Sequence, residues 1–160
     1  MSRFSTLILC IGIPGAGKTT WVYNYKRIHP LTYVISTDDI RKELTGEEQC
    51  VDPSQNDMIH NEARNRAKKI LDDPSSVGGF GPEIIIDSTN CSAEEWLAYK
   101  KLRPSLMRAI VFDCEPLKAL ENQKYRERQV PLEILEMKYT QLQENIPYLE
   151  MFFNCVDHVK

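Results

Sequence analysis

The 160-residue sequence has no long apolar run, no large excess of one charge and no paired cysteines. No apolar segment is long enough to cross a bilayer, so we expect no membrane association, and residues 1–4 leave no room for a signal peptide. The net charge of −3 provides no chain-wide basic field, so any nucleic acid must bind at a local basic patch. Five cysteines without a C-x-x-C pair do not make a disulfide framework, which favours free thiols in a reducing cytoplasm.

The chain also lacks internal repeats, low-complexity linkers and any histidine or cysteine spacing typical of a metal site. Hydrophobic residues make up 42% and charged residues 27%, which is ordinary for a globular protein. A chain of 160 residues fits one α/β domain and can bury a core of its own. We therefore expect a single domain over residues 1–160.

Apolar runs alternate with segments of helical pattern, which predicts a parallel sheet with helices on both faces. We expect strands over about 6–12, 32–36, 84–87, 107–112 and, at the end of the chain, 151–156. We expect helices over about 17–29, 38–44 and 53–72, and further helices that begin near residues 92, 116 and 131, the last running to about 144.

Residues 12–19 read G-I-P-G-A-G-K-T, the G-x-x-x-x-G-K-[ST] pattern of a phosphate-binding loop. An apolar strand precedes it and a helix follows, so backbone N–H groups and the helix dipole can meet phosphate oxygens. Lys18 would face the terminal phosphates and the Thr19 hydroxyl would bind Mg²⁺. A chance Gly-rich turn is disfavoured, because strand, loop, Lys-Thr and helix are all in register. The residues expected around ATP (or GTP) are Gly12, Pro14, Gly15, Ala16, Gly17, Lys18, Thr19 and Thr20.

Asp87 ends the apolar run Ile84–Ile86 and would lie beside the phosphate-binding loop at the carboxyl edge of the sheet. There its carboxylate can hold Mg²⁺ through water or polarise a group of the loop. The alternative is a turn or helix-capping aspartate, because residues 87–90 (D-S-T-N) are also typical of turns.

Asp38 and Asp39 follow the second strand directly, again at the carboxyl edge where open α/β sheets bind ligands. A carboxylate here can accept a proton from an attacking hydroxyl, the general-base role in phosphoryl transfer. The alternative is N-capping of the next helix, and two adjacent acids allow both roles. Arg41, three residues after Asp38, can hold an anionic part of the acceptor or be a solvated charge, the usual role of a lone arginine.

The segment 124–131 (K-Y-R-E-R-Q-V-P) carries three cations between two predicted helices and is typical of a kinase lid. Arg126 and Arg128 would close over the triphosphate; the alternative is a solvated basic helix end. The basic residues between Arg64 and Lys69 are interpreted as a solvated helix face. His60, Asn61 and Glu62 are further candidates for an acceptor pocket, although no motif requires it.

Taken together, these motifs resemble the kinase domain of the 5′-hydroxyl polynucleotide kinases, within the AAA-type group of small phosphate-loop kinases. The resemblance covers about residues 6–147. Its motifs are the phosphate-binding loop with Trp21, the D-D-x-R motif at Asp38–Arg41, the D-x-T-N motif at Asp87–Asn90, and the R-x-R-x-V-P end of the lid at Arg126–Pro131. The family commonly has Arg-Asn where this chain has Asn122-Gln123.

The resemblance implies a P-loop NTPase three-layer α/β sandwich with a central parallel sheet, flanking helices and a helical lid at about 122–132. It implies ATP- and Mg²⁺-dependent transfer of the γ-phosphate to a 5′-hydroxyl end of DNA or RNA. Asp38 would be the general base, with Lys18 and Arg126 as the other catalytic residues. The acceptor would contact Asp38, Arg41, Asp87, Thr89 and Asn90, and the metal would contact Thr19 and Asp87. The alternatives are a kinase of a nucleoside, sugar or antibiotic, and a non-catalytic nucleotide-binding subunit.

Overall fold

Strands and helices alternate along the chain in the computed structural model, which describes residues 3–46, 53–76, 81–126 and 129–160. The elements in chain order are β1 (Thr6–Ile11), α1 (Lys18–Ile28), β2 (Tyr33–Ser36), α2 (Thr37–Thr45), the 3₁₀ turn η1 (Pro53–Gln55), α3 (Asn56–Asp72), β3 (Glu83–Asp87), α4 (Ala93–Lys100), β4 (Leu106–Phe112), α5 (Pro116–Asn122), α6 (Leu132–Asn145), η2 (Ile146–Tyr148), α7 (Leu149–Phe152) and β5 (Cys155–Val159).

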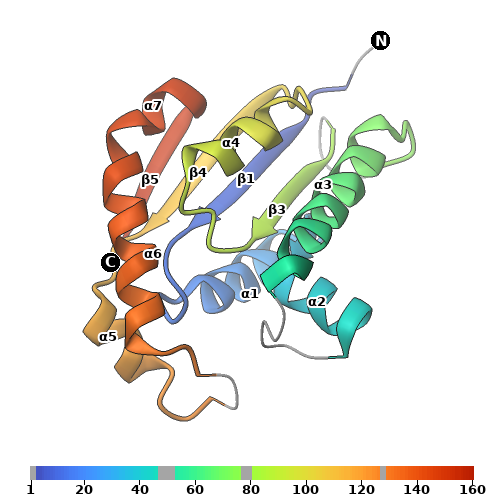
Figure 1. Ribbon diagram of the computed structural model, residues 1–160. Helices are drawn as coiled ribbons and strands as arrows, with labels where there is room; N and C mark the ends of the chain where they lie inside the picture. Colours follow the sequence, from blue (N-terminus) through green and yellow to red (C-terminus); the bar gives the residue numbers. More distant parts are fainter. Residues whose placement is uncertain (1–2, 47–52, 77–80, 127–128) are drawn as a thin grey trace.

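In the described part of the chain, five strands form one sheet in the spatial order β2-β3-β1-β4-β5, and each neighbouring pair is parallel (Figure 1). The central strand β1 pairs with β3 on one side and with β4 on the other. The chain moves from β1 outward to β2, returns to β3, and then crosses over β1 to β4. The predicted fold class, a parallel sheet flanked by helices, is confirmed.

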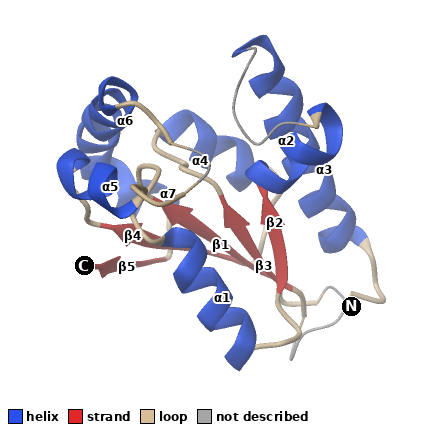
Figure 2. Cartoon of the chain, turned by 90° about the horizontal axis from the view of Figure 1, so that it is seen from below, coloured by secondary structure: helices blue, strands red, loops and turns tan. Residues whose placement is uncertain are grey.

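The two faces of the sheet carry separate apolar cores, because successive side chains of a strand point to opposite faces. Leu7, Leu9 and Ile11 belong to the larger core, which α3, α4 and α6 help to form. Ile8 and Cys10 belong to the smaller core, together with Val22 of α1. Figure 2 shows the same division, with α1 on one side of the sheet and α3, α4 and α6 on the other.

The predicted last strand was wrong in its position. Residues 149–152 form α7, and the strand β5 follows at 155–159. The apolar pair Met151-Phe152 that suggested a strand ends this helix, where the Phe152 ring packs edge-on against Trp96 at 5.8 Å. The helix predicted over 53–72 is also divided, into η1 and α3.

The parallel sheet brings three chain segments to one edge. The carboxyl end of β1 leads into the loop 12–17, that of β2 into α2, and that of β3 into residues 88–92. Because the carboxyl ends of parallel strands share an edge, these segments meet although they are separated in sequence. This edge is the one on which the sequence motifs fall.

Candidate active site

The loop between β1 and α1 has the backbone of a phosphate-binding site. Gly17 is the N-cap of α1 in the left-handed region (φ 99°), and no side chain caps this helix end. The first N–H groups of α1 are therefore left for another acceptor, and an anionic phosphate is the group that a helix N-terminus favours. Thr19 and Thr20, both exposed, lie in the first turn of the same helix.

Gly15 is required by the close approach of α5. Its φ is +86°, and a Cβ atom there would lie 2.5 Å from the carbonyl oxygen of Ala119. Asn122, at the end of α5, donates its Nδ2 to the Gly15 carbonyl at 2.9 Å. Pro14 and Ala16 flank this contact, and so the helix after β4 holds the phosphate-binding loop in place from the side.

The side chain of Lys18 is folded into its own loop. It is buried, and Nζ donates to the carbonyls of Gly12 and Ile13 at 2.8 Å each. Burial lowers the pKa of this amine, while Cys91, Asp87 and other acids oppose the shift. A buried ammonium is stabilised by anions, so the loop fits a nucleotide phosphate that would share or replace the carbonyl partners.

Asp87 ends β3 opposite the start of α1, and its Oδ2 accepts a hydrogen bond from Thr19 Oγ1 at 3.5 Å. Burial raises the pKa of the Asp87 carboxyl, Lys18 lowers it, and Asp38 raises it further. The Asp87 carboxylate and the Thr19 hydroxyl are both oxygen ligands, which is the kind of ligand that Mg²⁺ prefers. No group of three or more metal-ligating side chains occurs within the described residues, so phosphate and water oxygens would complete such a coordination shell.

Asp38 lies in the first turn of α2, and Ser36, not an aspartate, caps this helix. The Ser36 hydroxyl accepts from the backbone N–H of Asp39 at 3.3 Å. The capping alternative for the two acids is therefore wrong. The Asp38 side chain is 55% exposed and Oδ1 accepts from Nη1 of Arg41 at 3.0 Å. Ser36, two residues before Asp38, lies opposite Asp87 in the pairing of β2 with β3, and the Asp38 charge raises the pKa values of Lys18 and Asp87.

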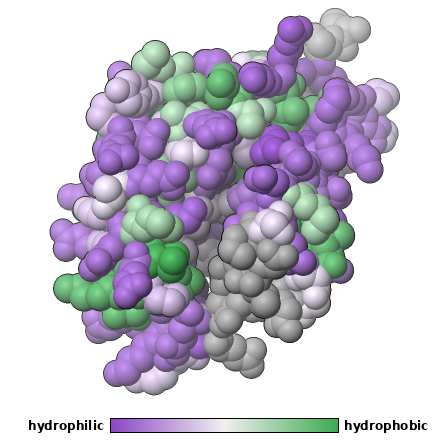
Figure 3. Space-filling view, in the orientation of Figure 1, coloured by the Kyte–Doolittle hydropathy of each residue, from purple (hydrophilic) through white to green (hydrophobic). Residues whose placement is uncertain are grey.

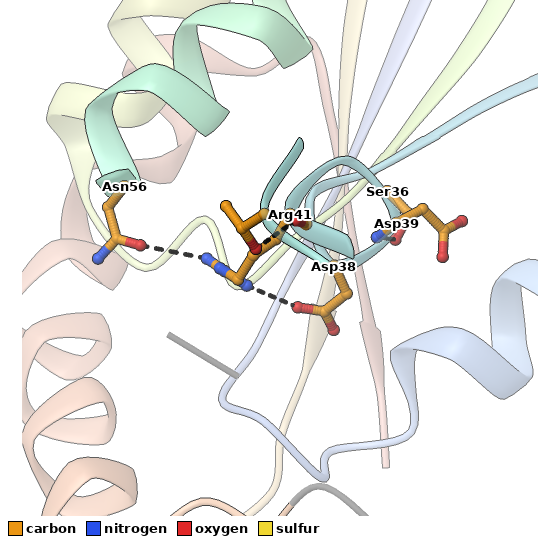
Figure 4. A network of polar contacts seen from close by, with 6 residues as sticks. Ser36, Asp38, Asp39, Arg41 and Asn56 are labelled. Atoms are coloured by element: carbon orange, nitrogen blue, oxygen red, sulfur yellow. Dashed lines mark hydrogen bonds and ion pairs between the residues drawn. The ribbon is translucent and has the colours of Figure 1, made fainter. Parts of the chain in front are cut away.

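Arg41 is buried, which the interpretation as a solvated charge did not predict. Besides Asp38, its guanidinium donates Nη2 to Oδ1 of Asn56 at 3.2 Å, and Figure 4 shows these three side chains pointing toward one another. The third guanidinium nitrogen, Nε, is buried and has no hydrogen-bond partner among the residues that the structure describes. Because Asp38 and Asn56 both accept from Arg41, the orientation of its guanidinium is fixed. A guanidinium of fixed orientation suits bidentate binding of a phosphate.

The residues after Asp87 connect the site to the central strand. The Thr89 carbonyl accepts from the Gly12 N–H at 2.9 Å. Asn90 has a φ of 47° and is buried, and its Nδ2 donates to the Cys10 carbonyl at 2.8 Å. The Asn90 carbonyl in turn accepts from Trp96 Nε1 at 2.6 Å. These bonds position the phosphate-binding loop, while the predicted contacts of Thr89 and Asn90 with an acceptor stay predictions.

A glutamine fixes the base of the predicted lid. Gln123 is buried; its Nε2 donates to the Val130 carbonyl and its Oε1 accepts from the Val130 N–H at 3.2 Å. This pair of bonds ties the end of α5 to the start of α6. Arg126 is exposed between these two anchor points, and Arg128 lies outside the described residues.

Sequence reasoning missed four supporting residues: Ser36, Asn56, Asn122 and Gln123. A serine before two acids is a typical N-cap signal and could have identified Ser36. No local signal identifies Asn56 or the asparagine and glutamine at 122–123, because their partners lie 7 to 107 residues away in the chain.

The sheet order, the phosphate-binding loop and the acids at the carboxyl edge define a kinase-like P-loop fold. The AAA domain family model matches residues 7–145, and the chain belongs to this family. None of the helices in the described ranges is both long and apolar enough for a bilayer span.

Solved structures show the same fold. A chain of the Pnkp1/Rnl/Hen1 RNA repair complex superposes with a TM-score of 0.78 and 19% identity, covering 96% of this chain and 48% of that one. A gluconokinase from Sinorhizobium meliloti 1021 gives 0.62 and 13%, over 98% and 83% of the two chains. A second structure of the Pnkp1/Rnl/Hen1 complex gives 0.61 and 20%, over 82% and 42%. The present chain thus spans about half the length of the chain in the RNA repair complex, and the resemblance to the polynucleotide kinase domain is confirmed for the fold.

Proposed function

We propose that this chain is an ATP- and Mg²⁺-dependent kinase that phosphorylates the 5′-hydroxyl of a polynucleotide. The observation that carries the proposal is the ion pair between Asp38 and Arg41, next to the phosphate-binding loop. It places a potential proton acceptor and a potential phosphate-binding fork on one turn of one helix. A nucleic acid 5′ end offers both groups, a hydroxyl and a phosphate on its 3′ side.

In the proposed reaction, Asp38 takes the proton of the 5′-hydroxyl as its oxygen bonds to the γ-phosphorus, and the bond to the β–γ bridging oxygen breaks. ADP leaves and the new phosphate monoester stays on the acceptor. Lys18 offsets charge on the phosphates, and Arg126 and Arg128 of the proposed lid (about 122–132) close over them. Thr19 and Asp87 would hold Mg²⁺, which would supply positive charge against the charge of the phosphates.

Positioning follows from the residues that surround these groups. The Arg41 guanidinium holds Asp38 Oδ1 at 3.0 Å, which fixes the carboxylate near the acceptor. The negative charge of Asp87 raises the pKa of Lys18, and the positive charge of Lys18 lowers the pKa of Asp87. A bound metal–phosphate group would supply each of these two charges with a partner of the opposite sign.

We propose that the domain extends over residues 1–160.

One observation favours a second candidate, a small-molecule kinase. The fold also matches a gluconokinase over 98% of this chain, and the net charge of −3 provides no general attraction for a polyanion. A non-catalytic nucleotide-binding subunit is the third possibility, but it gives no role to a carboxylate at the acceptor side.

The test is transfer of labelled γ-phosphate from ATP to 5′-hydroxyl DNA, 5′-hydroxyl RNA, an unphosphorylated nucleoside and gluconate. The proposal predicts label on the oligonucleotides, recovered in the 5′-mononucleotide after complete nuclease digestion. Lys18→Ala serves as the inactive control. Label only on gluconate or the nucleoside would replace the proposal with the small-molecule kinase, and ATP binding without transfer to any acceptor would replace it with the binding subunit.

A further inference from the structure

Two polar contacts between α2 and α3 differ in their surroundings. At the candidate active site, Nη2 of Arg41 on α2 donates to Oδ1 of Asn56, the first residue of α3, at 3.2 Å. Farther along α3, Nη2 of Arg66 donates to Oε2 of Glu43 on α2 at 2.8 Å. Because both contacts join the same two helices, a local effect of the first can be separated from a general effect on helix packing.

The first contact holds a buried cation, and the second lies at the surface. Arg41 is only 7% exposed, whereas the side chains of Arg66 and Glu43 are 35% and 57% exposed, as expected of a solvated helix face. Figure 3 shows a mainly hydrophilic surface over the C-terminal part of α3, at the upper right. Exposed ion pairs contribute little to stability, but a buried charged group depends on well-placed partners. The Asn56 oxygen is therefore a partner that the Arg41 guanidinium requires.

The hydrophobic core fixes the place of Asn56 relative to Arg41. Ile40 directly precedes Arg41 in α2, and Ile59 lies one turn after Asn56 in α3. Both isoleucines are buried in the same core, which α2 and α3 share with the sheet. Close-packed side chains allow little relative movement of the elements that carry them. The Asn56 oxygen is therefore held at a defined position beside α2.

Asp38 and Asn56 bind different nitrogens of the Arg41 guanidinium. Nη1 donates to Asp38 at 3.0 Å and Nη2 donates to Asn56 at 3.2 Å. A guanidinium is planar and carries five N–H donors, so two bonds from different nitrogens fix both its position and its rotation. With Asp38 as the only partner, the plane could turn about a single bond, and the other N–H groups would have no fixed direction.

The two partners also differ in how they behave during the proposed reaction. Asp38 would become neutral when it accepts the proton of the 5′-hydroxyl, and a neutral carboxyl holds a guanidinium less strongly than a carboxylate does. The Asn56 amide does not titrate, so its bond to Nη2 is independent of that proton transfer. Asn56 is therefore the partner that can keep Arg41 oriented while the proton moves.

We propose that Asn56 is a positioning residue that orients the Arg41 guanidinium toward the phosphate on the 3′ side of the attacking nucleoside. This inference rests on the proposed function and adds to it a residue, from a second helix, on which the choice of acceptor depends. Asn56 acts through Arg41 and sets the preference for acceptors that carry this phosphate.

The test measures a preference ratio, which is kcat/KM for a nucleoside 3′-phosphate divided by kcat/KM for the same nucleoside. Asn56→Ala should lower this ratio by about three- to tenfold, the scale of one lost hydrogen bond. The fall should appear mainly as a higher KM for the 3′-phosphate. It should be smaller than the fall in Arg41→Ala, because the guanidinium is still present and has lost only its fixed orientation.

A double-mutant cycle tests whether Asn56 acts through Arg41. In the Arg41→Ala background, Asn56→Ala should cause no further fall in the preference ratio, because the group that it orients is already missing. Arg66→Ala is the matched control: it breaks the other contact between α2 and α3 and should keep the wild-type ratio. Thermal unfolding confirms that each variant is folded. If Asn56→Ala does not fold, Asn56→Ser, which has a shorter polar side chain, takes its place.

The outcomes that overturn the positioning role differ in what they say of the function. An unchanged ratio in the folded Asn56 variant, an equal fall in Arg66→Ala, or a further fall in the Arg41→Ala background removes the role of Asn56 and leaves the polynucleotide kinase in place. Equal use of the nucleoside and its 3′-phosphate by the wild type, or absence of transfer to any 5′-hydroxyl acceptor with intact ATP binding, overturns the proposed function and the inference with it.

Discussion

Arg41 and Asp38 form an ion pair of 3.0 Å within one turn of α2, between a buried guanidinium and an exposed carboxylate. The buried Arg41 guanidinium also donates to Asn56, while the Asp38 carboxylate remains exposed to solvent, where the proposed acceptor would bind. Burial of a charged group is costly unless its partners are well placed. The arrangement is therefore built to fix Asp38, and the first prediction concerns this carboxylate.

Asp38→Asn should lower the rate of phosphate transfer by roughly 10²–10⁴-fold, the usual scale of general-base catalysis. Nucleotide affinity should change little, because the residue lies on the acceptor side. Single-turnover transfer and ATP titration measure the two quantities separately. Asp39→Asn is the matched control, since Asp39 is exposed and adjacent. A collapse of ATP affinity with normal transfer per bound ATP would make Asp38 a structural or metal-linked residue.

Lys18→Ala should remove the buried cation that donates to the Gly12 and Ile13 carbonyls of the phosphate-binding loop, where we propose that the nucleotide phosphates bind. We expect transfer to fall by at least roughly 10²-fold, the scale for loss of one preorganised charge-stabilising donor. The rise in unfolding temperature on addition of Mg·ATP should also be lost. Lys101→Ala, an exposed lysine at the end of α4, should match the wild type in both assays. Normal turnover by the folded Lys18 variant would refute the nucleotide site.

Asp87→Asn tests how the negative charge of this carboxylate, which accepts from the Thr19 hydroxyl, affects stability. Burial raises the pKa of this carboxyl, so the folded chain binds its proton more tightly than the unfolded chain does. Its contribution to stability is therefore complete at pH values below the ordinary aspartate pKa and is lost as the pH rises through the folded pKa.

The neutral variant should accordingly unfold at a higher temperature than the wild type at pH 7 in metal-free buffer. The difference should close as the pH falls below about 4, the ordinary aspartate value. Addition of Mg·ATP should stabilise the variant less than the wild type. Calorimetry across this pH range measures both effects, and a difference independent of pH would show that the Asp87 charge is already balanced in the free protein.

Gln123→Leu should loosen the base of the proposed lid. The substitution leaves the N–H and C=O of Val130 without their partner, which costs about 1–3 kcal/mol when such groups are buried. We expect lower stability and a higher KM for ATP. Denaturant unfolding and steady-state kinetics check the two effects. Gln143→Leu, exposed on α6, should have neither, and an unchanged KM in the Gln123 variant would separate this anchor from nucleotide binding.

Local sequence patterns predicted the elements that carry the phosphate-binding loop. The apolar run 7–11, the G-x-x-x-x-G-K-[ST] spacing and the acid that ends Ile84–Ile86 each depend on neighbours in the chain, and the structure places all three at one edge of the sheet. The helix at Pro116 follows from the fixed φ of proline at a first-turn position. Such patterns can be recognised in a sequence because they depend only on residues that are close together in the chain.

Long-range partners could not be predicted in the same way. The sequence does not show that the Asn56 side chain reaches Arg41 or that the Gln123 side chain reaches Val130. The position of β5 was also missed: residues 149–152 form α7, in which the Phe152 ring packs edge-on against Trp96 of α4. The partners of these side chains are brought together by the tertiary fold, and the periodicity of the sequence does not predict them.

The most direct test of the polynucleotide kinase compares a nucleoside with its 3′-phosphate as acceptors for the wild type and Arg41→Ala. If Arg41 pairs with the phosphate on the 3′ side of the attacking nucleoside, the 3′-phosphate should be the better acceptor by about 10- to 150-fold in kcat/KM, corresponding to one charge-assisted hydrogen bond. Arg41→Ala should narrow this gap and leave the KM for ATP almost unchanged. Equal use of both acceptors by the wild type would contradict the polynucleotide assignment and point to a small-molecule kinase.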